Sequence, residues 1–301
     1  MSGMRQDALF DGDWAQRWSL GRHTWRHRHD GGFDPDRYEV VPLAEDKPVR
    51  AFLEAHHYLT GLPPAVFRYA MVDVRHPATG GLPGRMVGVM VLSVPMNRRA
   101  LTNVFPGLEP VAESLDFSRL CLLDEVAANG ESWFCAASFR HAAAQGVRGI
   151  VTFADPMPYR RRTAHGTHLI TPGHAGVVYQ ALGFEHLGRS TSRTQILLPD
   201  GTALTARSAA KATGGEQGAA AVERRLVALG ARARARGQSP RVWLAQALNE
   251  VGATRRRHPG CYRYALRIGR TRAERTAVRI ALASLPYPKP AALPAALGTV
   301  S

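Results

Sequence analysis

The sequence contains few cysteines, no long apolar run and few acidic residues in its last third. Its three cysteines, Cys121, Cys135 and Cys261, form no Cys-x-x-Cys pair, which argues against a disulfide framework and a structural zinc site. We expect them to be small buried hydrophobic residues. No apolar run approaches the roughly 20 residues of a membrane helix, and the N-terminal segment lacks a signal-peptide layout. These absences predict a soluble, cytoplasmic protein without a membrane partner.

The positive charge of the chain is concentrated at one end. Residues 201–301 contain 18 Lys and Arg against 4 Asp and Glu, whereas residues 1–200 contain 21 against 20. The formal net charge of +15 therefore belongs almost entirely to the C-terminal third. Such asymmetry favours contact with a polyanion such as nucleic acid. The alternative is an arginine-rich surface that only solvates helices.

Strand and helix patterns alternate between residues 37 and 200. Residue patterns predict strands at 37–41, 67–74, 86–94, 114–122, 149–154 and 188–197, and helices at 46–57, 131–145 and 175–182. The order β-α-β-β-β-α-β-α-β predicts an α/β fold around a mixed sheet.

The remaining segments differ in composition from this region. Residues 1–36 and 269–301 are expected to be poorly ordered, and the Ala-, Gly- and Thr-rich segment 201–221 is expected to be a linker. Residues 222–268 then predict a basic helical extension that returns to the core. It contains helices at 222–236 and 241–251, a basic turn at 255–257 and a strand at 262–268.

Several short motifs follow one another along the chain. They are His57-Tyr58, Gly88-Val89, Asp116-Phe117-Ser118-Arg119-Leu120, Asn129-Gly130-Glu131-Ser132, Phe153-Ala154-Asp155-Pro156, Gly173-His174-Ala175-Gly176-Val177-Val178-Tyr179-Gln180-Ala181, His258 and Tyr262-Arg263-Tyr264. In this order they resemble the phage Mom family of the GNAT acyltransferase superfamily, over about residues 50–268. The resemblance implies a GNAT-like mixed β-sheet flanked by helices, with an acyl-CoA-binding catalytic domain at 37–200. It also implies an enzyme that alters adenine N6 in DNA using acetyl-CoA, and thereby evades restriction.

Two features depart from the family pattern. The family usually has Glu-Leu-Ser-Arg-Leu where this chain has Asp116-Phe117-Ser118-Arg119-Leu120. In the family the Ala-Asp motif runs almost directly into Gly-His, whereas here residues 157–172 intervene and include Arg160, Arg161 and Arg162. This basic insertion either touches DNA phosphates or forms a disordered loop.

The candidate catalytic residues are Tyr179, Asp155, His57 and Tyr58. Tyr179 precedes a Leu-Gly-Phe helix end, as in many acyltransferases that use coenzyme A, and is the candidate general acid for the leaving thiolate. Its alternative role is packing in the core. Asp155 closes a strand, where it orients the adenine amine or takes its proton; its alternative role is to cap a turn. His57, followed by Tyr58, is a base, a metal ligand or a structural residue.

The candidate cofactor-binding residues lie at a strand end and a helix start. Asn129, Gly130 and Ser132 open the central helix, where backbone N–H groups suit a pyrophosphate, although Asn129 or Ser132 is equally a helix cap. The backbone amides of Ser118 and Arg119 suit the thioester oxygen. Arg119 is alternatively an ion-pair partner.

The candidate nucleic-acid contacts are basic and aromatic. Arg160–Arg162 and Arg255–Arg257 would bind phosphates of double-stranded DNA, whose adenine must leave the helix to be modified. Tyr262 and Tyr264 are candidate stacking residues for the base, and packing within strands is their alternative role.

The resemblance leaves the chemistry incomplete. Its product is a methylcarbamoyl group, which contains a nitrogen that acetyl-CoA does not supply, and no residue in the sequence explains the source. Acetyl-CoA is the expected co-substrate; iron is possible, but the sequence offers no convincing ligand set, so no metal residue is predicted. Two alternatives remain: a GNAT N-acetyltransferase for a small amine or protein, and a non-catalytic nucleic-acid-binding protein with a degenerate acyltransferase core. The sequence does not predict the oligomeric state.

Overall fold

The computed structural model describes residues 14–19, 22–27, 32–57, 59, 61–163, 166–171 and 173–288, with side chains except those of 14–27 and 160–171. The chain forms two compact units. The first comprises Met1–Asp155, His174–Gly188 and Tyr262–Ser301, and the second comprises Pro156–Gly173 and Arg189–Cys261. Among the described helices, none has the length and apolar character needed to cross a membrane.

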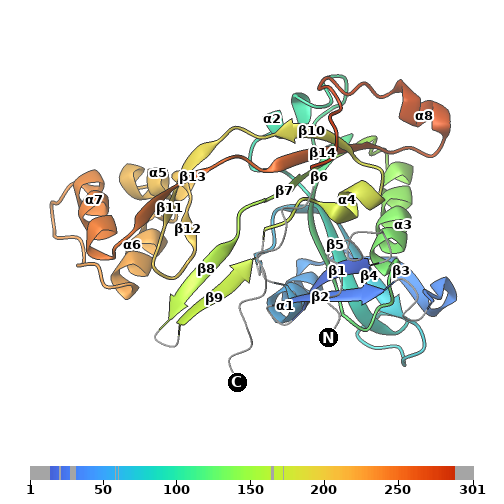
Figure 1. Ribbon diagram of the computed structural model, residues 1–301, viewed down its shortest axis with the longest axis horizontal. Helices are drawn as coiled ribbons and strands as arrows, with labels where there is room; N and C mark the ends of the chain where they lie inside the picture. The colour runs from blue at the N-terminus through green and yellow to red at the C-terminus, as the bar shows by residue number, and fades with distance from the viewer. Residues whose placement is uncertain are drawn as a thin grey trace, which may run out of the picture. The chain divides into compact units, whose positions relative to one another are not determined.

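A seven-stranded sheet forms the centre of the first unit, in the order β10-β14-β7-β6-β5-β4-β3 (Figure 1). The strands are β3 Tyr38–Pro42, β4 Ala65–Asp73, β5 Arg85–Ser93, β6 Ser114–Leu122, β7 Gly149–Ala154, β10 Glu185–Arg189 and β14 Tyr262–Arg267. β6 and β7 are parallel, whereas the β3–β4, β4–β5, β5–β6 and β7–β14 pairs are antiparallel. The predicted mixed sheet is therefore confirmed.

Helices α1 (Asp46–His56) and α3 (Gly130–Ala144) pack on opposite faces of this sheet. Val89 and Val91 of β5 are buried in a cluster with residues of α1, whereas Met90 and Leu92 are buried in a cluster with residues of α3. Successive side chains of a strand point to opposite faces, so the two clusters lie on the two sides of the sheet. The prediction of flanking helices is confirmed as well.

Helix α3 ends where the sequence predicts. Gly146 has a φ of 98°, its N–H donates to Ala143 O at 3.2 Å, and the N–H of Val147 donates to Ala142 O at 3.1 Å. This pattern closes a helix by way of a glycine in the left-handed region. The chain then enters β7, beside β6.

Two elements differ from the prediction, the first because a glycine interrupts it. The predicted helix 175–182 is the shorter α4 (Val177–Ala181), since Gly176 has a φ of 78°. The predicted strand 188–197 is two strands, β10 and β11 (Arg193–Leu197), which belong to different sheets. Gly188, also at a φ of 78°, lies in β10.

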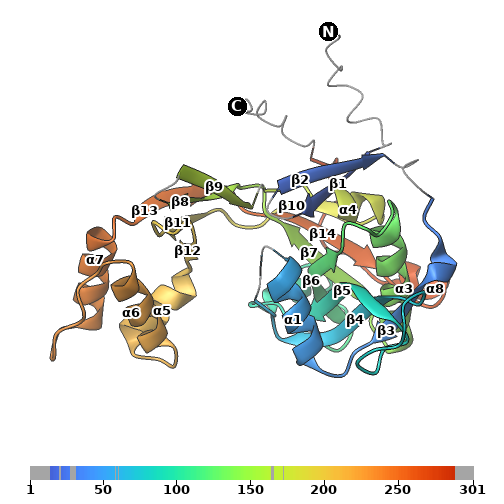
Figure 2. The same ribbon diagram turned by 90° about the horizontal axis from the view of Figure 1, so that it is seen from below.

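The second unit has its own core, and its helices and strands are drawn in Figure 2. Its elements are the hairpin strands β8 Tyr159–Thr163 and β9 Gly166–Thr171, the sheet strands β11, β12 Ala203–Leu204 and β13 Thr254–His258, and the helices α5 Ala206–Gly214, α6 Ala219–Ala228 and α7 Pro240–Glu250. The sheet order is β12-β11-β13. The buried core consists of Leu198, Leu204, Ala212, Leu226, Ala231, Trp243, Leu244, Ala247 and Val251.

Several segments contain more structure than the sequence predicts. The expected linker 201–221 holds β12 and α5, and the expected basic turn 255–257 lies in β13. The insertion 157–172 contains the β8–β9 hairpin. The expected poorly ordered ends contain β1 Trp14–Ser19, β2 Arg22–His27 and a 3-10 turn Pro35–Arg37 at one end, and α8 Arg272–Ala277 at the other. A short helix, α2 Arg99–Thr102, completes the first unit.

Candidate functional site

Strands β6 and β7 pair over only three residues. The parallel ladder joins Ser114 to Gly149, Leu115 to Ile150 and Asp116 to Val151, although β6 continues to Leu122 and β7 to Ala154. Beyond the ladder, the hydroxyl of Thr152 donates to the backbone oxygen of Phe117 at 2.8 Å. The facing edges beyond Asp116 therefore carry backbone groups that are not paired with each other. Such groups suit an extended ligand rich in amides.

A β-bulge at Ser118 lies beside this divergence. Val91 of β5 is opposite Arg119 and Leu92 is opposite Phe117, so Ser118 is the extra residue. Bulges of this kind occur often next to active sites, because they redirect backbone groups. The bulge supports the predicted role of the Ser118 and Arg119 amides at a thioester oxygen, a role that remains a prediction.

The guanidinium of Arg119 holds two backbone segments together. It donates to Gly61 O at 3.1 Å and 2.8 Å, and to Ser118 O at 2.7 Å. These bonds connect β6 to the loop that follows α1. Arg119 therefore fixes the position of the bulge, which is a different use from the ion pair considered in the sequence.

His57 follows α1 directly and is close to other cationic groups. Its Nδ1 is 3.0 Å from both the N and the O of Leu59. The pKa of His57 is lowered to about 4, mainly by desolvation and to a smaller extent by the neighbouring Arg119 and His174, whereas the bond to Leu59 acts in the opposite direction. The imidazole is therefore neutral at pH 7. Tyr58, the candidate catalytic residue that follows it, lies outside the described residues.

Tyr179 lies on α4 within a group of aromatic rings. Its ring centroid is 5.7 Å from that of Phe117, 5.7 Å from Phe184 and 5.5 Å from Tyr264. The side chain is partly buried, so it has both the packing role and the exposure that a general acid needs. Because Phe117 precedes the Ser118 bulge, Tyr179 is adjacent to the candidate thioester site.

Gly176 allows this arrangement of Tyr179 and Tyr264. A Cβ at residue 176 would lie 2.7 Å from Cδ2 of Tyr179 and 2.8 Å from Cε2 of Tyr264. Only glycine fits at this distance and at a φ of 78°. Steric contact with the two tyrosine rings therefore explains why the second glycine of the Gly-His-Ala-Gly motif is a glycine.

Tyr264 is fully buried, which differs from its predicted role as a stacking residue. Its hydroxyl donates to Ala175 O, and Gln180 Nε2 donates to the same hydroxyl at 3.4 Å. A ring held in the core has no exposed face for a base. Tyr262 is only partly buried, and its ring packs 5.7 Å from His186.

Two titratable residues were not selected from the sequence, although both lie in the quoted motifs. The backbone N–H of His174 donates to Asp155 O at 2.8 Å, and burial lowers the pKa of His174 despite the nearby Asp155 carboxylate. Asp116 is opposite Ser93 and Val151 at the last paired position of β6 and β7. Desolvation raises the pKa of Asp116 to about 7, against the charge of Arg119. In the sequence, Asp116 stands near the start of the strand β6 and His174 in the segment that precedes α4.

The predicted pyrophosphate site lies at the start of α3. Asn129 has a φ of 73° and makes no side-chain cap bond, and the hydroxyl of Ser132 donates to Asn129 O at 3.0 Å. Asn129 thus occupies the N-cap position, as the alternative considered in the sequence expects, but its side chain does not bond a backbone N–H of the helix. A Cβ at Gly130 would lie 2.4 Å from Val126 Cγ1, so Gly130 is required by packing. Binding of a pyrophosphate by these backbone groups stays a prediction.

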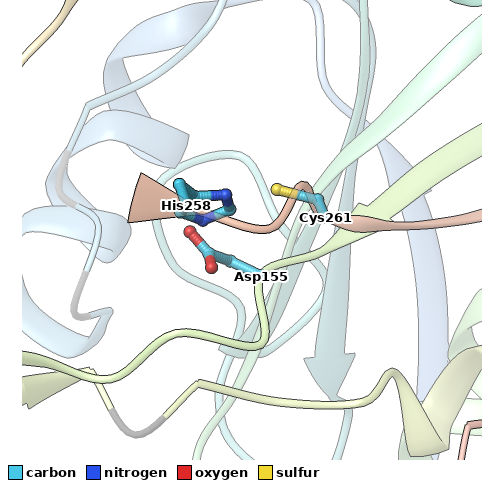
Figure 3. A group of neighbouring side chains, drawn as sticks. All are labelled: Asp155, His258 and Cys261. Atoms are coloured by element: carbon cyan, nitrogen blue, oxygen red, sulfur yellow. The ribbon is translucent and has the colours of Figure 1, made fainter. Parts of the chain in front are cut away.

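Asp155, His258 and Cys261 form a group of neighbouring side chains (Figure 3). Asp155 and Cys261 each lie one residue beyond Ala154 and Tyr262, which are paired in the β7–β14 ladder. One nitrogen, one sulfur and one carboxylate oxygen lie within 4.8 Å of one another. Cys121 and Cys135 are buried as predicted, whereas Cys261 is partly exposed.

This donor set has the composition of a transition-metal site, but the tautomer of His258 does not suit a metal ligand. Carboxylate, imidazole and thiolate are all ligands for iron or zinc. However, the N–H of Gly260 donates to His258 Nδ1 at 3.0 Å, so the neutral ring carries its proton on Nε2. A ligating histidine normally donates from its second nitrogen. The Nε2 of the neutral His258 ring therefore carries a proton where a metal ion would need a lone pair.

The predicted phosphate-binding arginines differ in their surroundings. Arg255 and Arg257 of β13 are exposed, whereas Arg256 is partly buried and donates to Pro158 O at 3.0 Å. The backbone of Arg160–Arg162 lies in β8, but their side chains are outside the described part of the structure. A pocket in the first unit is lined by none of the predicted site residues. It is lined by Gly183, Glu185, Ala265, Leu266, Arg267, Arg272, Arg275 and Thr276.

Comparison of the sequence with models of protein families gives a match. The sequence model of the Mom protein family matches residues 39–289. The chain belongs to the Mom protein family. Members of this family modify phage DNA, and the match spans the mixed sheet and the second unit. No curated protein matches this Mom family chain.

One similar solved structure is a tandem GNAT protein from the clavulanic acid biosynthesis pathway, determined without AcCoA. It shares 13% sequence identity with this Mom family member, at a TM-score of 0.31. The match covers 78% of this chain and 75% of the other.

Proposed function

We propose that this Mom family member modifies the N6 amine of adenine in double-stranded DNA with a group derived from acetyl-CoA. The observation that carries the proposal is the position of Tyr179. It packs on Phe117, next to the Ser118 bulge and to the point where β6 and β7 stop pairing. The residues that would bind the activated acyl group and the amide-rich donor chain are thus adjacent to a proton donor, Tyr179.

The chemistry of acyl transfer assigns a role to each of these groups. The amine nitrogen forms a bond to the thioester carbonyl carbon, and the carbon–sulfur bond breaks. The Ser118 and Arg119 amides stabilise the negative charge that develops on the carbonyl oxygen. The Tyr179 phenol donates a proton to the departing thiolate, and the Asp155 carboxylate takes the proton that the amine loses. The adenine leaves the duplex to reach these residues.

The product of this transfer alone is an N6-acetyl group. The methylcarbamoyl group implied by family resemblance has one additional NH, so it requires a nitrogen donor besides acetyl-CoA. The two products differ in mass, which makes the distinction measurable.

Mass spectrometry of nucleosides tests the proposal. DNA is isolated from cells that express the unmodified protein and, separately, from cells that express the Tyr179→Phe variant. We expect an adenine nucleoside with a two-carbon adduct only in the first sample. Carbon-13 in both acetyl carbons of acetyl-CoA should appear in the adduct of a purified reaction. Unmodified adenine from a preparation that binds acetyl-CoA would refute the proposal.

The same preparations separate the two alternatives. Turnover of acetyl-CoA with small amines or a protein, independent of DNA, identifies an N-acetyltransferase. Salt-sensitive DNA binding without acetyl-CoA binding identifies a non-catalytic protein. Both assays use the full chain, and the DNA-binding assay includes unlabelled DNA as competitor.

A further inference from the structure

The second unit contains a large excess of positive charge, and its acidic residues are used internally. Residues 189–261 contain thirteen Lys and Arg against four Asp and Glu, a formal charge of +9. Each carboxylate of this segment forms an ion pair with an arginine of the same segment. The pairs are Arg225–Asp200 at 3.2 Å, Arg207–Glu216 at 2.6 Å, Arg232–Glu250 at 2.8 Å and Arg234–Glu223 at 2.9 Å.

Many of the other arginines are exposed to solvent. Six of them are Arg193, Arg224, Arg236, Arg241, Arg255 and Arg257. Within the described part of the chain, none of these six has a carboxylate at ion-pair distance. A surface with this charge attracts a polyanion and releases its counterions on contact.

Strand β13 presents two of these arginines in a row. β13 is an edge strand of its sheet, and Arg255 and Arg257 are opposite Ile196 and Thr194 of β11. Residues two apart on a strand share a face and are separated by roughly 6.6 Å. Arg257 also donates to the hydroxyl of Ser192 at 2.6 Å, which orients its guanidinium.

Arg256, between them, has a different use. It is opposite Gln195, donates to Pro158 O at 3.0 Å and approaches Met157 Sδ at 3.9 Å. The phenol of Tyr159 donates to Gln195 on the same side at 3.0 Å. Arg256 therefore attaches the segment before the β8–β9 hairpin to the sheet. The three consecutive arginines thus divide into two for a ligand and one for the fold.

From these contacts we infer that the exposed face of β13 at Arg255 and Arg257 binds the phosphate backbone of double-stranded DNA. The choice of DNA as the polyanion rests on the proposed function. Charge complementarity and the internal use of every acidic residue in the segment supply the physical argument. The contact is independent of base sequence, because both guanidinium groups bind phosphates.

The salt dependence of DNA affinity tests this inference. Fluorescence anisotropy of the full chain with a labelled duplex is measured between 50 and 200 mM salt, a range in which phosphate contacts dominate. The double variant Arg255→Ala, Arg257→Ala should lose two phosphate contacts. The slope of log K against log salt should therefore become less negative by about 1.8. The double Arg→Lys variant should keep most of the original slope, because it keeps the charge.

A matched control removes the same net charge elsewhere in the unit. Arg207→Ala combined with Arg232→Ala deletes two arginines that already have carboxylate partners. We expect its slope to match the unmodified protein. If the control changes the slope as much as the β13 variant, binding reflects diffuse net charge and the inference is overturned. Preferential binding of duplex RNA in competition would overturn it too.

Failure of this inference and failure of the proposed function give different results. The slope is measured without acetyl-CoA, and Tyr179→Phe should leave it unchanged. An altered slope in the β13 variant supports the surface even when no adenine adduct forms. An adduct that forms at the normal rate with an unaltered slope in the β13 variant refutes the surface alone.

Discussion

The ring of Tyr179 lies 5.7 Å from the ring of Phe117, the residue that directly precedes the extra residue of the β6 bulge. This contact connects a short helix, α4, to the strand whose backbone is redirected. Removal of the phenol oxygen should therefore affect chemistry without disturbing the packing. Tyr179→Phe should reduce adenine modification about 100- to 10,000-fold, the usual contribution of a general acid. Nucleoside mass spectrometry measures the effect, and an unfolding curve checks the fold.

Tyr264→Phe is the control for this prediction. Its hydroxyl is buried and donates to Ala175 O, so its loss should lower stability by about 1 kcal/mol. Modification per folded molecule should stay close to normal. If Tyr264→Phe abolishes modification and Tyr179→Phe does not, the roles of the two tyrosines are exchanged.

A second prediction concerns the glycine that separates these tyrosines. Gly176→Ala adds a Cβ 2.7 Å from Tyr179 and 2.8 Å from Tyr264, at a φ of 78°. The strained backbone and the overpacking together should cost about 2 to 5 kcal/mol. Gly183→Ala has nearly the same φ, 77°, but nothing lies within 4 Å of its added Cβ. Urea unfolding should show the larger loss for Gly176→Ala. Equal losses would mean that the steric contact is relaxed.

Much of the first unit could be predicted from the sequence, and the reason is local. β6, β7 and α1 are marked by apolar runs, periodicity and flanking polar residues, and they end within a residue of prediction. The bulge at Ser118 and the short β6–β7 ladder depend on pairing between distant segments. No local pattern carries that information.

The second unit shows a different limit. Alanine, glycine and threonine in residues 201–221 have the composition of a linker, yet Ala212 is buried against residues of the unit's core. Small residues form a helix face when a partner is available, and the partner helix α7 begins 28 residues later, at Pro240. Similarly, Arg255–Arg257 is a strand because β11 pairs with it, whereas the sequence favours a turn.

Asp116 should make stability depend on pH in an unusual direction. Its folded-state pKa of about 7 lies above the ordinary value of 3.8, so the folded chain binds more protons between these values. Stability should therefore fall as pH rises from about 4 to 7 through this group. Asp116→Asn should be more stable than the unmodified protein at pH 8, by about 2 to 4 kcal/mol, and similar to it at pH 4. Unfolding curves at both pH values measure the difference.

The exposed Asp36 provides the control for Asp116. Asp36→Asn should change stability little at either pH. Asp116→Glu restores the residue type that the family motif usually has at this position. If the stability difference between Asp116→Asn and the unmodified protein is the same at pH 8 as at pH 4, the Asp116 carboxyl is not desolvated.

His57 should affect stability at lower pH. Its folded-state pKa of about 4 lies below the ordinary value of 6.5, so the unfolded chain binds more protons between these values. Stability should therefore fall as pH decreases from about 6.5 to 4, and His57→Gln should weaken this dependence. Adenine modification should show no titration of His57 between pH 6 and 8. An NMR titration of the His57 ring with a midpoint near 6.5 would contradict the desolvated environment.

The tautomer of His258 leads to a prediction about metal binding. Because Gly260 N–H donates to Nδ1, the neutral ring has its proton on Nε2 and offers no lone pair there. Protein equilibrated with Fe²⁺ or Zn²⁺ and then desalted should retain the same metal content as the variants His258→Ala and Cys261→Ala, measured by elemental analysis. His258→Ala should instead lower stability by about 1 to 3 kcal/mol, because Gly260 N–H loses its acceptor in a buried turn. Loss of one metal ion per chain in both variants would show that the imidazole changes tautomer and that Asp155, His258 and Cys261 are ligands.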